Sequence, residues 1–432
     1  MIPRLPPSAW HVLAADFMSA LGSGLSLPFL LIYLHKIRGL DVEIAAEAIA
    51  TIGLVALAMN PLGGYLSDRW GPRTLLVAGL VLSGLGTGGW LLVTRPWQAF
   101  AVAAIFALGI SMSVPAQSAL LGSIAAPSQR SAVFSVAHMT LNVGLGVGSL
   151  AASLIVDSAH ADAFTAIYVL DASTFLIASA IVGRCPLSSS DELQTQSADD
   201  RPVGEVRSGY REVFRDRVFV RVWILSAVLV TAGFGQMQTT VPAVAMGEGG
   251  LQAQHMGVIY AVNTVVVVAL QLIVLRLVAN RRRTRVLMAL ALLWATSWAL
   301  TFLAAVLPFH RSGVLALFVA ATAVFALGET LLAPSLPALV NDLAPEKLRG
   351  SYNGALALAY TVGFTAGPLV SGWSIGHGRT TVLLVGLAAA CVVTLPLAYG
   401  LEGHIADAVN RIPGAPSERG TRRSPERRAG AL

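Results

Sequence analysis

The chain has 432 residues, of which 55% are hydrophobic and 12% charged, and its mean hydropathy is +0.70. Soluble globular proteins keep about 25% charged residues, so the composition excludes that class and indicates a membrane protein. The formal net charge of +6 could suggest a nucleic-acid partner, but the distribution of the charges, described below, argues against one. The two widely separated cysteines, Cys185 and Cys391, exclude a disulfide framework or a cysteine metal cluster, and no metal or cofactor is expected.

Apolar runs of roughly 20 residues, the length that crosses about 30 Å of hydrocarbon as a helix, recur along the chain. Twelve such runs predict an all-α membrane protein with twelve transmembrane helices. They begin near Trp10, Ala45, Thr74, Gln98, Ala132, Ala163, Phe219, Gln254, Arg285, Gly313, Ser351 and Thr380. The first run contains Asp16 and Pro28 and lacks a convincing cleavage site, so we interpret it as a retained span and not as a signal peptide.

The positive charges are divided unevenly between the loops. If both termini face the cytoplasm, the external loops hold only five of the 29 Lys and Arg, namely Lys36, Arg38, Arg95, Arg311 and Arg379. Such a bias orients a membrane protein, so the charge indicates a lipid bilayer and not nucleic acid as the partner. Arg outnumbers Lys 27 to two, which is typical of a GC-rich bacterial genome. We expect a monomer in the bacterial inner membrane with cytoplasmic termini.

A polar segment at residues 185–218 divides the chain into two bundles of six spans, residues 1–184 and 219–401. The first part of this linker is rich in Ser and Asp and is typical of a flexible connection. Its last part has basic and apolar residues at helical spacing, which predicts an amphipathic helix on the cytoplasmic membrane surface. Residues 402–432 are polar and basic and are predicted to form a solvated, disordered cytoplasmic tail.

The two halves are related by a tandem repeat. Residues 105–109 (IFALG) return as residues 324–328 (VFALG), an offset of 219 residues. Further pairs at this offset are Pro115 and Pro334, Arg130 and Arg349, Gly144 and Gly363, and Gly148 and Gly367. Two membrane repeats with a binding site between them are typical of secondary transporters, so the repeat favours transport as the function.

The loop between the second and third spans reads Gly64-Tyr65-Leu66-Ser67-Asp68-Arg69-Trp70-Gly71-Pro72-Arg73. This sequence resembles the G-x-L-x-D-R-x-G-R-R/K loop of the major facilitator superfamily, with Pro72 where a basic residue is usual. In a duplicated chain of twelve spans, the resemblance covers the whole protein. It implies the major facilitator fold, two pseudo-symmetric six-helix bundles, and looks closest to the twelve-span drug/proton antiporter branch. Span four lacks the Arg that exporters often carry, and residues 144–149 lack the Pro of the G-x-x-x-G-P pattern.

The resemblance also implies a conformational latch formed by Gly64, Asp68, Arg69, Gly71 and Arg73. In the family, this aspartate engages the cytoplasmic N-terminus of span eleven when the cavity opens outward. Span eleven begins here near Arg349, and a carboxylate at a helix N-terminus is favoured by the helix dipole. The matching loop of the second half, residues 279–284, contains neither Asp nor Gly, so a one-sided latch is expected.

Three ionisable residues within the spans are candidates for proton coupling. Glu329 lies near the middle of span ten, where a carboxylate costs roughly 2.5–3.5 kcal/mol. We interpret it as a proton carrier, with a structural, hydrogen-bonded Glu as the alternative. Asp16 in span one and His138 in span five lie at similar depth, roughly 10 Å from the cytoplasmic ends. Because these spans are neighbours in the resembling family, an Asp16–His138 pair is predicted as a proton-sensitive element, with two independent residues as the alternative. Asp171 in span six is interpreted as a structural helix contact.

Few polar residues remain to line a cavity. The candidates for hydrogen bonding to a substrate are Gln117, Gln236 and Gln238. The candidates for an apolar wall are Phe106, Met112, Phe234, Met237 and Phe325. Because the cavity would hold one acid, and no Lys or Arg lies in the middle of a span, it suits a lipophilic neutral or cationic compound better than a sugar or an anion. Taken singly, each of these residues is more often lipid-facing or part of a helix core than a ligand contact.

These features predict a secondary active transporter that exports a small, mostly hydrophobic compound by alternating access, in exchange for protons. The alternatives are a proton-coupled uptake symporter or facilitator of the same fold and, from another class, a non-transporting membrane sensor. The expected partners are a small-molecule substrate, protons and the bilayer. No enzymatic activity is expected. The G-x-S-x-G match at residues 372–376 lies at the end of a membrane span, without the strand that precedes a hydrolase nucleophile.

Overall fold

The computed structural model describes residues 5–30, 33–155, 161–185, 206–237, 239–251, 254–307 and 310–413. Across these ranges the regular elements are helices, with a single isolated β-bridge and no strand. Twelve of the helical segments are long and apolar enough to cross a membrane. The predicted all-α fold with twelve transmembrane helices is therefore confirmed.

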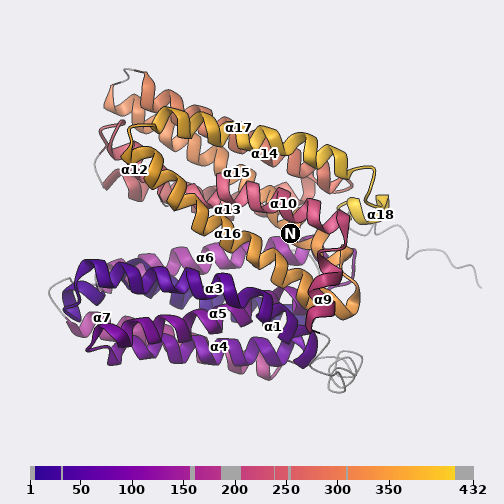
Figure 1. The fold of residues 1–432 in the computed structure, drawn as a ribbon, viewed down its shortest axis with the longest axis horizontal. Coiled ribbons are helices and arrows are strands. Elements are labelled where there is room, and N and C mark those ends of the chain that lie inside the picture. Colours follow the sequence, from indigo (N-terminus) through magenta and orange to yellow (C-terminus); the bar gives the residue numbers. More distant parts are fainter. Residues whose placement is uncertain are drawn as a thin grey trace, which may run out of the picture.

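The first six spans form the N-terminal bundle, which runs from indigo to magenta in Figure 1. These spans are α1 (Pro7–Ser26), extended by the 3-10 turn η1 (Leu27–Phe29), α3 (Val42–Trp70), α4 (Pro72–Gly89), α5 (Pro96–Ile124), α6 (Arg130–Ile155) and α7 (Ala161–Gly183). Two short elements, η2 (Tyr33–Ile37) and η3 (Trp90–Leu92), lie in its connections. Helix α1 packs on α6 and α7, and α4 packs on α5 and α7, so these contacts bury apolar side chains between the spans.

The C-terminal bundle repeats this arrangement. Its spans are α10 (Arg217–Ala232) with the short α11 (Phe234–Met237) and α12 (Thr240–Met246), α13 (Gln254–Leu277), α14 (Arg283–Val306), α15 (Arg311–Leu343), α16 (Arg349–Gly376) and α17 (Thr380–Leu401). The turn η5 (Glu346–Leu348) joins α15 to α16. The seventh span is interrupted at Gly233, where an added Cβ would lie 2.2 Å from the ring of Trp294. Only glycine allows α10 and α14 to approach so closely at this point.

The sequence repeat is visible in the packing of the helices. An added Cβ on Gly148 of α6 would lie 2.1 Å from the backbone oxygen of Leu21 in α1. Its repeat partner, Gly367 of α16, makes the equivalent crossing in the other bundle, where a Cβ would lie 2.5 Å from the backbone oxygen of Gly235 in α11. Glycine at these two positions lets matched helix pairs pack backbone to backbone. The duplicated glycines therefore belong to helix packing within each bundle.

The two bundles lie side by side, with α16 against α3 and α5, and α6 against α13 and α15 (Figure 1). The linker helix α9 (Val206–Val213) lies at one end of this interface, which we call the linker side; the opposite end is the distal side. Tyr210 of α9 donates a hydrogen bond to the backbone oxygen of Pro61 in α3, with the two oxygens 2.5 Å apart. The helix at the end of the linker is thus present, while the Ser-rich residues 186–205 lie outside the described part.

The segment after the last span differs from the prediction of a disordered tail. Residues 402–413 are folded onto the linker side and include the short helix α18 (Asp407–Asn410), seen in yellow in Figure 1. Ile405 and Ile412 are buried, at 6% and 0% exposure. These two apolar side chains anchor a segment whose composition is otherwise polar. Residues 414–432, which hold the remaining arginines of the tail, lie outside the described part.

Candidate functional site

A buried carboxyl group joins the two bundles near the middle of their spans. Glu329 lies close to the middle of α15 and is 5% exposed. Asn263 of α13, in the same bundle, donates from Nδ2 to Oε2 at 3.0 Å. On the other side, Nε2 of His138 in α6 lies 3.2 Å from Oε1. Both carboxyl oxygens of Glu329 therefore have a partner, one from each bundle, as a carboxyl group inside a membrane requires.

The second buried acid lies within the N-terminal bundle. Asp16 of α1 is 8% exposed and accepts a hydrogen bond at Oδ1 from Nε2 of Gln117 in α5, at 2.8 Å. Its Oδ2 accepts from Oγ1 of Thr140 in α6, at 3.3 Å. Helices α1, α5 and α6 thus converge on Asp16. Because Asp16 also interacts electrostatically with His138, which contacts Glu329, the two acids belong to one polar group of side chains.

Asp16 and His138, predicted to form a proton-sensitive pair, make no hydrogen bond to each other in this conformation. His138 faces α15 across the interface, so its Nε2 meets Glu329 and, at 3.3 Å, the Nδ2 of Asn142. Asp16 interacts with His138 electrostatically, while its described hydrogen bonds go to the side chains named above. The result is a continuous polar group that reaches from the N-terminal to the C-terminal bundle. We call it the central cluster: Asp16, Gln117, His138, Thr140, Asn263 and Glu329.

Aromatic side chains border the central cluster on the C-terminal side. The ring of Phe234 in α11 stacks near Tyr360 of α16, with centroids 6.5 Å apart, and near Phe364, at 6.3 Å. Tyr360 is close enough to Glu329 to feel its charge, and Phe364 is 49% exposed. The carboxylate can contact the charge of an organic cation, and the partly open aromatic rings can contact its apolar body. Sequence reasoning missed Tyr360, because a lone tyrosine in a glycine-rich span carries no signal of its own.

The two phenylalanines of the repeat do not line a cavity. Phe106 is 5% exposed and packs edge-on against Phe175 of α7, while Phe325 is 1% exposed and stacks on Trp294 at 4.8 Å. Both point into the interior of their own bundle, so the prediction of a cavity wall at these positions is wrong. Met112 likewise packs on the core of the N-terminal bundle.

The glutamines of the seventh span have other positions than expected. Gln236 is fully buried, and its Nε2 donates to the backbone oxygens of Thr231 and Gly367 at 3.0 and 3.3 Å. Its Oε1 accepts from Thr240 and Ser371. With the whole amide used in holding the broken span to α16, Gln236 has a structural role. Gln238 lies outside the described residues, and its neighbour Met237 belongs to the core of the bundle.

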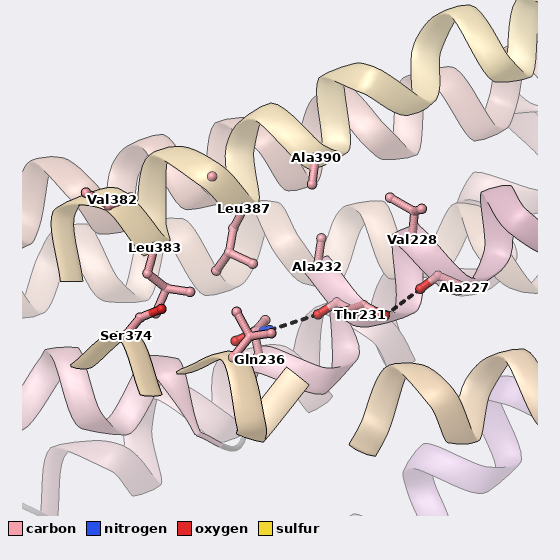
Figure 2. Close-up of a pocket in the computed structure, with 12 residues that line it drawn as sticks. Ala227, Val228, Thr231, Ala232, Gln236, Ser374, Val382, Leu383, Leu387 and Ala390 are labelled. Carbon is pink, nitrogen blue, oxygen red and sulfur yellow. Dashed lines mark hydrogen bonds between the residues drawn. The ribbon is translucent and has the colours of Figure 1, made fainter. Parts of the chain in front are cut away.

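A pocket of about 480 Å³ lies between α10, α16 and α17, away from the interface of the bundles (Figure 2). Its wall is almost entirely apolar, with Leu383 and Leu387 opposite Ala232. The hydroxyl of Thr231 at this wall donates to the backbone oxygen of Ala227. Since none of the central cluster lines it, this pocket is not the site at which the bundles could share a substrate.

On the linker side, the motif loop contacts the start of α16. Asp68 accepts at Oδ1 from the backbone N–H of Gly350 at 2.6 Å, and at Oδ2 from the N–H of Ser351 at 2.7 Å and from its hydroxyl at 2.5 Å. An added Cβ on Gly64 would lie 2.6 Å from the backbone oxygen of Gly350, so only glycine fits this crossing of α3 and α16. The contact that the resemblance implied for Asp68 is present in the structure.

The other residues of the motif act within the N-terminal bundle. Gly71 has a φ of 81° and ends α3, a left-handed conformation that favours glycine. Arg73 donates from Nη2 to the backbone oxygen of Gly183 at 2.6 Å, which ties α4 to the end of α7. Arg69 lies 3.5 Å from the hydroxyl of Tyr65, one turn earlier. Their contacts are local, and Asp68 and Gly64 make the contacts across the interface.

A second contact shows that the expectation of a one-sided latch is wrong. Asp342, at the end of α15, pairs through Oδ1 with Arg130 at the start of α6 and through Oδ2 with Arg283 of α14, at 2.6 Å. Nη2 of Arg283 also reaches the hydroxyl of Ser131 at 3.4 Å. The basic loop of the second half thus contributes a cation instead of the motif aspartate. Sequence reasoning did not identify Asp342, because a pair separated by 212 residues leaves no local pattern.

Together these contacts close the linker side of the interface. Asn60 of α3 adds a hydrogen bond across it, from Nδ2 to Oγ1 of Thr361 at 2.6 Å. The named bonds between the bundles run from the central cluster to the linker side. The central cluster therefore lies at the inner limit of the closed part of the interface.

Comparisons with known proteins agree with this architecture. The family model of the Major Facilitator Superfamily matches residues 12–309 and 282–424. The chain is 24% identical over 383 residues to a protein of Edwardsiella ictaluri named multidrug resistance protein MdtH, covering 86% of this chain and 87% of that one. It is 23% identical over 405 residues to a Na(+), Li(+), K(+)/H(+) antiporter of Planococcus maritimus, covering 86% and 91%. Among solved structures, a bacterial homologue of the iron transporter ferroportin in an outward-facing state has a TM-score of 0.75 at 12% identity, covering 92% of this chain and 99% of that one.

Proposed function

Because the chain belongs to the major facilitator superfamily, a family of membrane transporters, we propose that it exports lipophilic cations in exchange for protons. The family assignment makes it a multi-pass transporter of small molecules and not an enzyme. The observation that carries the finer proposal is the contact of Glu329 with His138 across the two bundles. It places an ionisable pair at the point where the halves must separate in alternating access.

Proton exchange follows from the charges of the central cluster. Asp16 and Glu329 each accept a hydrogen bond from a side-chain amide. A proton on Glu329 removes its attraction for protonated His138 and so weakens a contact between the bundles. A bound cation would stabilise the ionised carboxylates instead. Protons and a cation would therefore compete for the same two groups, which is the requirement for antiport.

The surroundings of the cluster favour an organic cation. Every Arg and Lys of the chain lies near the end of a span or outside the spans, so Asp16 and Glu329 meet no fixed cation in the middle of the membrane. Tyr360 lies within electrostatic reach of Glu329, and its ring neighbours that of Phe234, which in turn neighbours Phe364. Aromatic faces attract cations by roughly 0.5–2 kcal/mol. The relative named as a multidrug resistance protein is consistent with a lipophilic substrate.

The orientation of the chain in the membrane is inferred from the charge bias of the loops. The linker side carries most of the Arg and Lys, so the positive-inside rule makes it cytoplasmic, with both termini inside. The bacterial relatives and the Arg-rich composition suit the inner membrane. The closed linker side then corresponds to an outward-facing conformation, in which protons reach the cluster from outside. The return step would open the linker side to take up substrate from the cytoplasm. We propose that one chain carries out this cycle as a monomer.

Exchange of an alkali cation for protons is the second candidate. Asp16 and Thr140 present oxygen atoms to one another within 3.3 Å, and hard cations prefer oxygen ligands. A relative covering most of this chain is named for Na(+), Li(+) and K(+) exchange. The aromatic border of Glu329 has no role in this candidate, which is why we place it second. A proton-coupled uptake symporter of the same fold would need the proton and the substrate to bind together, and not to compete for Asp16 and Glu329.

The test is proton release from inside-out membrane vesicles with an acid interior. Tetraphenylphosphonium or ethidium added to wild-type vesicles should release protons, and the Glu329→Gln variant should release none. The matched control is Glu248→Gln, which removes an exposed carboxyl outside the spans and should behave like wild type. Release on adding NaCl, LiCl or KCl alone would select the second candidate. No release with any cation in wild type would overturn antiport, and release that persists in Glu329→Gln would remove Glu329 from the coupling.

A further inference from the structure

The chain that follows the last span is fixed to the loop before α14. The backbone N–H of Asn280 donates to the oxygen of Ile412 at 2.8 Å, and the N–H of Ile412 donates to the oxygen of Arg281 at 2.9 Å. Ile412 is fully buried at this bridge. Glu402 pairs with Arg282 and Arg285, in each case at 2.8 Å. Residues 402–412 therefore form a closed strap over the start of α14, which we call the C-terminal clamp.

One side chain of the C-terminal clamp caps α14 from outside the helix. The first N–H groups of a helix have no partner within it, and Arg282, at the N-cap position of α14, provides no side-chain cap. Instead Asn410 accepts at Oδ1 from the backbone N–H of Thr284 at 3.1 Å and donates from Nδ2 to its hydroxyl, also at 3.1 Å. Asn410 is 1% exposed. Its amide thus fixes the first turn of α14.

The same turn carries the arginine that reaches the other bundle. Nη1 of Arg283 donates to the backbone oxygen of Val409 in the C-terminal clamp at 2.8 Å and to Asp342 at 2.6 Å. Nη2 of Arg283 points to Ser131 of the N-terminal bundle. Arg283 is fully buried and lies near a second cation, Arg130. A guanidinium in this position keeps its direction only if its neighbours hold it. Val409 does so directly, and Asn410 does so through the adjoining Thr284.

We infer that the C-terminal clamp is part of the gate on the linker side, with Asn410 as the positioning residue that aims Arg283 at Ser131 and Asp342. The inference rests on the alternating-access part of the proposed function, in which the linker side must open and close. The clamp, α14 and α15 all belong to the C-terminal half, so they move together. Of the contacts that Arg283 and Asp342 make, those with Ser131 and Arg130 cross the interface and are lost on opening. Loss of the cap therefore destabilises the closed conformation selectively, through Arg283.

The test measures distances between the bundles by double electron–electron resonance, with nitroxides at Ser128 and Lys347 on the linker side and at Asp162 and Arg311 on the distal side. All four positions are exposed, and Cys185 and Cys391 are replaced by Ala. Asn410→Leu should raise the ratio of open to closed linker-side distances by roughly fivefold, the effect of one weakened hydrogen bond between the bundles. The distal distances should shorten in parallel.

Three variants keep the result interpretable. Asn410→Asp retains an acceptor for the Thr284 N–H and should restore most of the closed population. Asp407→Asn alters a neighbouring exposed residue that pairs only with Arg282 and Arg411 among the ion pairs described, and it should behave like wild type. Removal of residues 414–432 leaves the clamp intact and should also have no effect. The thermal midpoint is measured for each variant, so that unfolding is separated from opening.

Two results would overturn the inference. If Asn410→Leu lowers the thermal midpoint but leaves both distance distributions unchanged, the clamp only stabilises the fold. If the effects of Asn410→Leu and Ser131→Ala on the open-to-closed ratio simply add, Asn410 does not act through Arg283, because coupled residues give non-additive effects. Neither measurement needs a substrate or a proton gradient. Failure of the export proposal therefore shows in the vesicle assay and failure of the clamp in the distances.

Discussion

Nε2 of His138 and Oε1 of Glu329 lie 3.2 Å apart across the interface of the two bundles. His138 enters from the N-terminal repeat and Glu329 from the C-terminal repeat, and the repeat partner of Glu329 is Ile110. The duplicated halves are thus chemically unequal at their centre. A symmetric scaffold carries an asymmetric ionisable pair, with the second acid, Asp16, on the histidine side.

The first prediction concerns His138. His138→Gln retains a hydrogen-bond donor for Glu329 but removes the ring that can carry a proton, so in the proposed cycle it should lower substrate-driven proton release while the contact between the bundles persists. The measurement is the initial rate of substrate-driven proton release, with the linker-side distances recorded beside it. His310→Gln, in an exposed loop, is the control. An unchanged rate in His138→Gln would remove His138 from the coupling and leave it to the carboxyl groups.

The comparison of sequence and structure shows which features hydropathy can define. Each span was predictable because a transmembrane helix needs about 20 contiguous apolar residues. The repeat predicted that the helices of the two halves would pack in a similar way. The direction in which a residue faces was not predictable, as Phe106 and Phe325 show. In a span that is apolar all round, no periodicity distinguishes the bundle core from the cavity. The glycines of the repeat were informative, since close helix crossings leave room for no other residue.

The features that sequence reasoning missed depend on contacts between distant segments. Arg130 and Asp342 are each unremarkable at the end of an apolar run, and only the fold brings them together. The C-terminal clamp was interpreted as disordered because its apolar residues, Ile405 and Ile412, are too few to form a pattern. Their burial follows from the shape of the loop before α14. A polar segment can therefore be ordered when a few anchors fit a preformed surface.

The second prediction concerns the latch at Asp68. Asp68→Asn removes the charge that accepts three hydrogen bonds at the N-terminus of α16. Hydrogen bonds to a charged group contribute about 1.5–3 kcal/mol. The ratio of closed to open linker-side conformations should therefore fall by on the order of tenfold or more. The linker-side distance distribution measures the effect. Asp41→Asn is the matched control, because Asp41 lies at the other end of α3 and makes no capping hydrogen bond. Equal distributions in the two variants would contradict a latch.

The third prediction tests a close helix crossing. Gly148→Ala places a Cβ 2.1 Å from the backbone oxygen of Leu21, so α1 and α6 must move apart. Overpacking of this kind costs about 1–3 kcal/mol, and the thermal midpoint of the purified protein should fall. Gly386→Ala in α17 meets no atom within 4 Å, and it should be neutral or slightly stabilising because alanine favours a helix. Equal midpoints for both variants would show that the bundle adapts at the crossing.

The fourth prediction is a pH dependence of the C-terminal clamp. Hydrogen bonds from Arg282 and Arg285 hold the pKa of the Glu402 carboxyl below its usual value of 4.5. A lowered pKa in the folded state means that Glu402 stabilises the clamp above about pH 4.5 and that this stabilisation is lost as the pH falls further. A nitroxide at the exposed Ala408 should become more mobile on acidification through this range. In Glu402→Gln, the label should be mobile already at neutral pH and change less. A wild-type label that stays immobile below pH 4 would contradict the prediction.

The fifth prediction concerns the shared carboxylate of the gate. Asp342 is the anion between Arg130 and Arg283, and breaking a buried ion pair by removing one partner costs about 3–5 kcal/mol. Asp342→Asn leaves two buried cations facing each other, so it should lower the thermal midpoint and open the linker side. The double variant Asp342→Asn with Arg283→Gln removes one of the two unpaired charges. It should recover part of the loss, because Arg130 is then the one cation left of the pair and no longer repels Arg283. If the double variant is less stable than Asp342→Asn, the contribution of Arg283 comes from its contacts with Val409 and Ser131 and not from its charge.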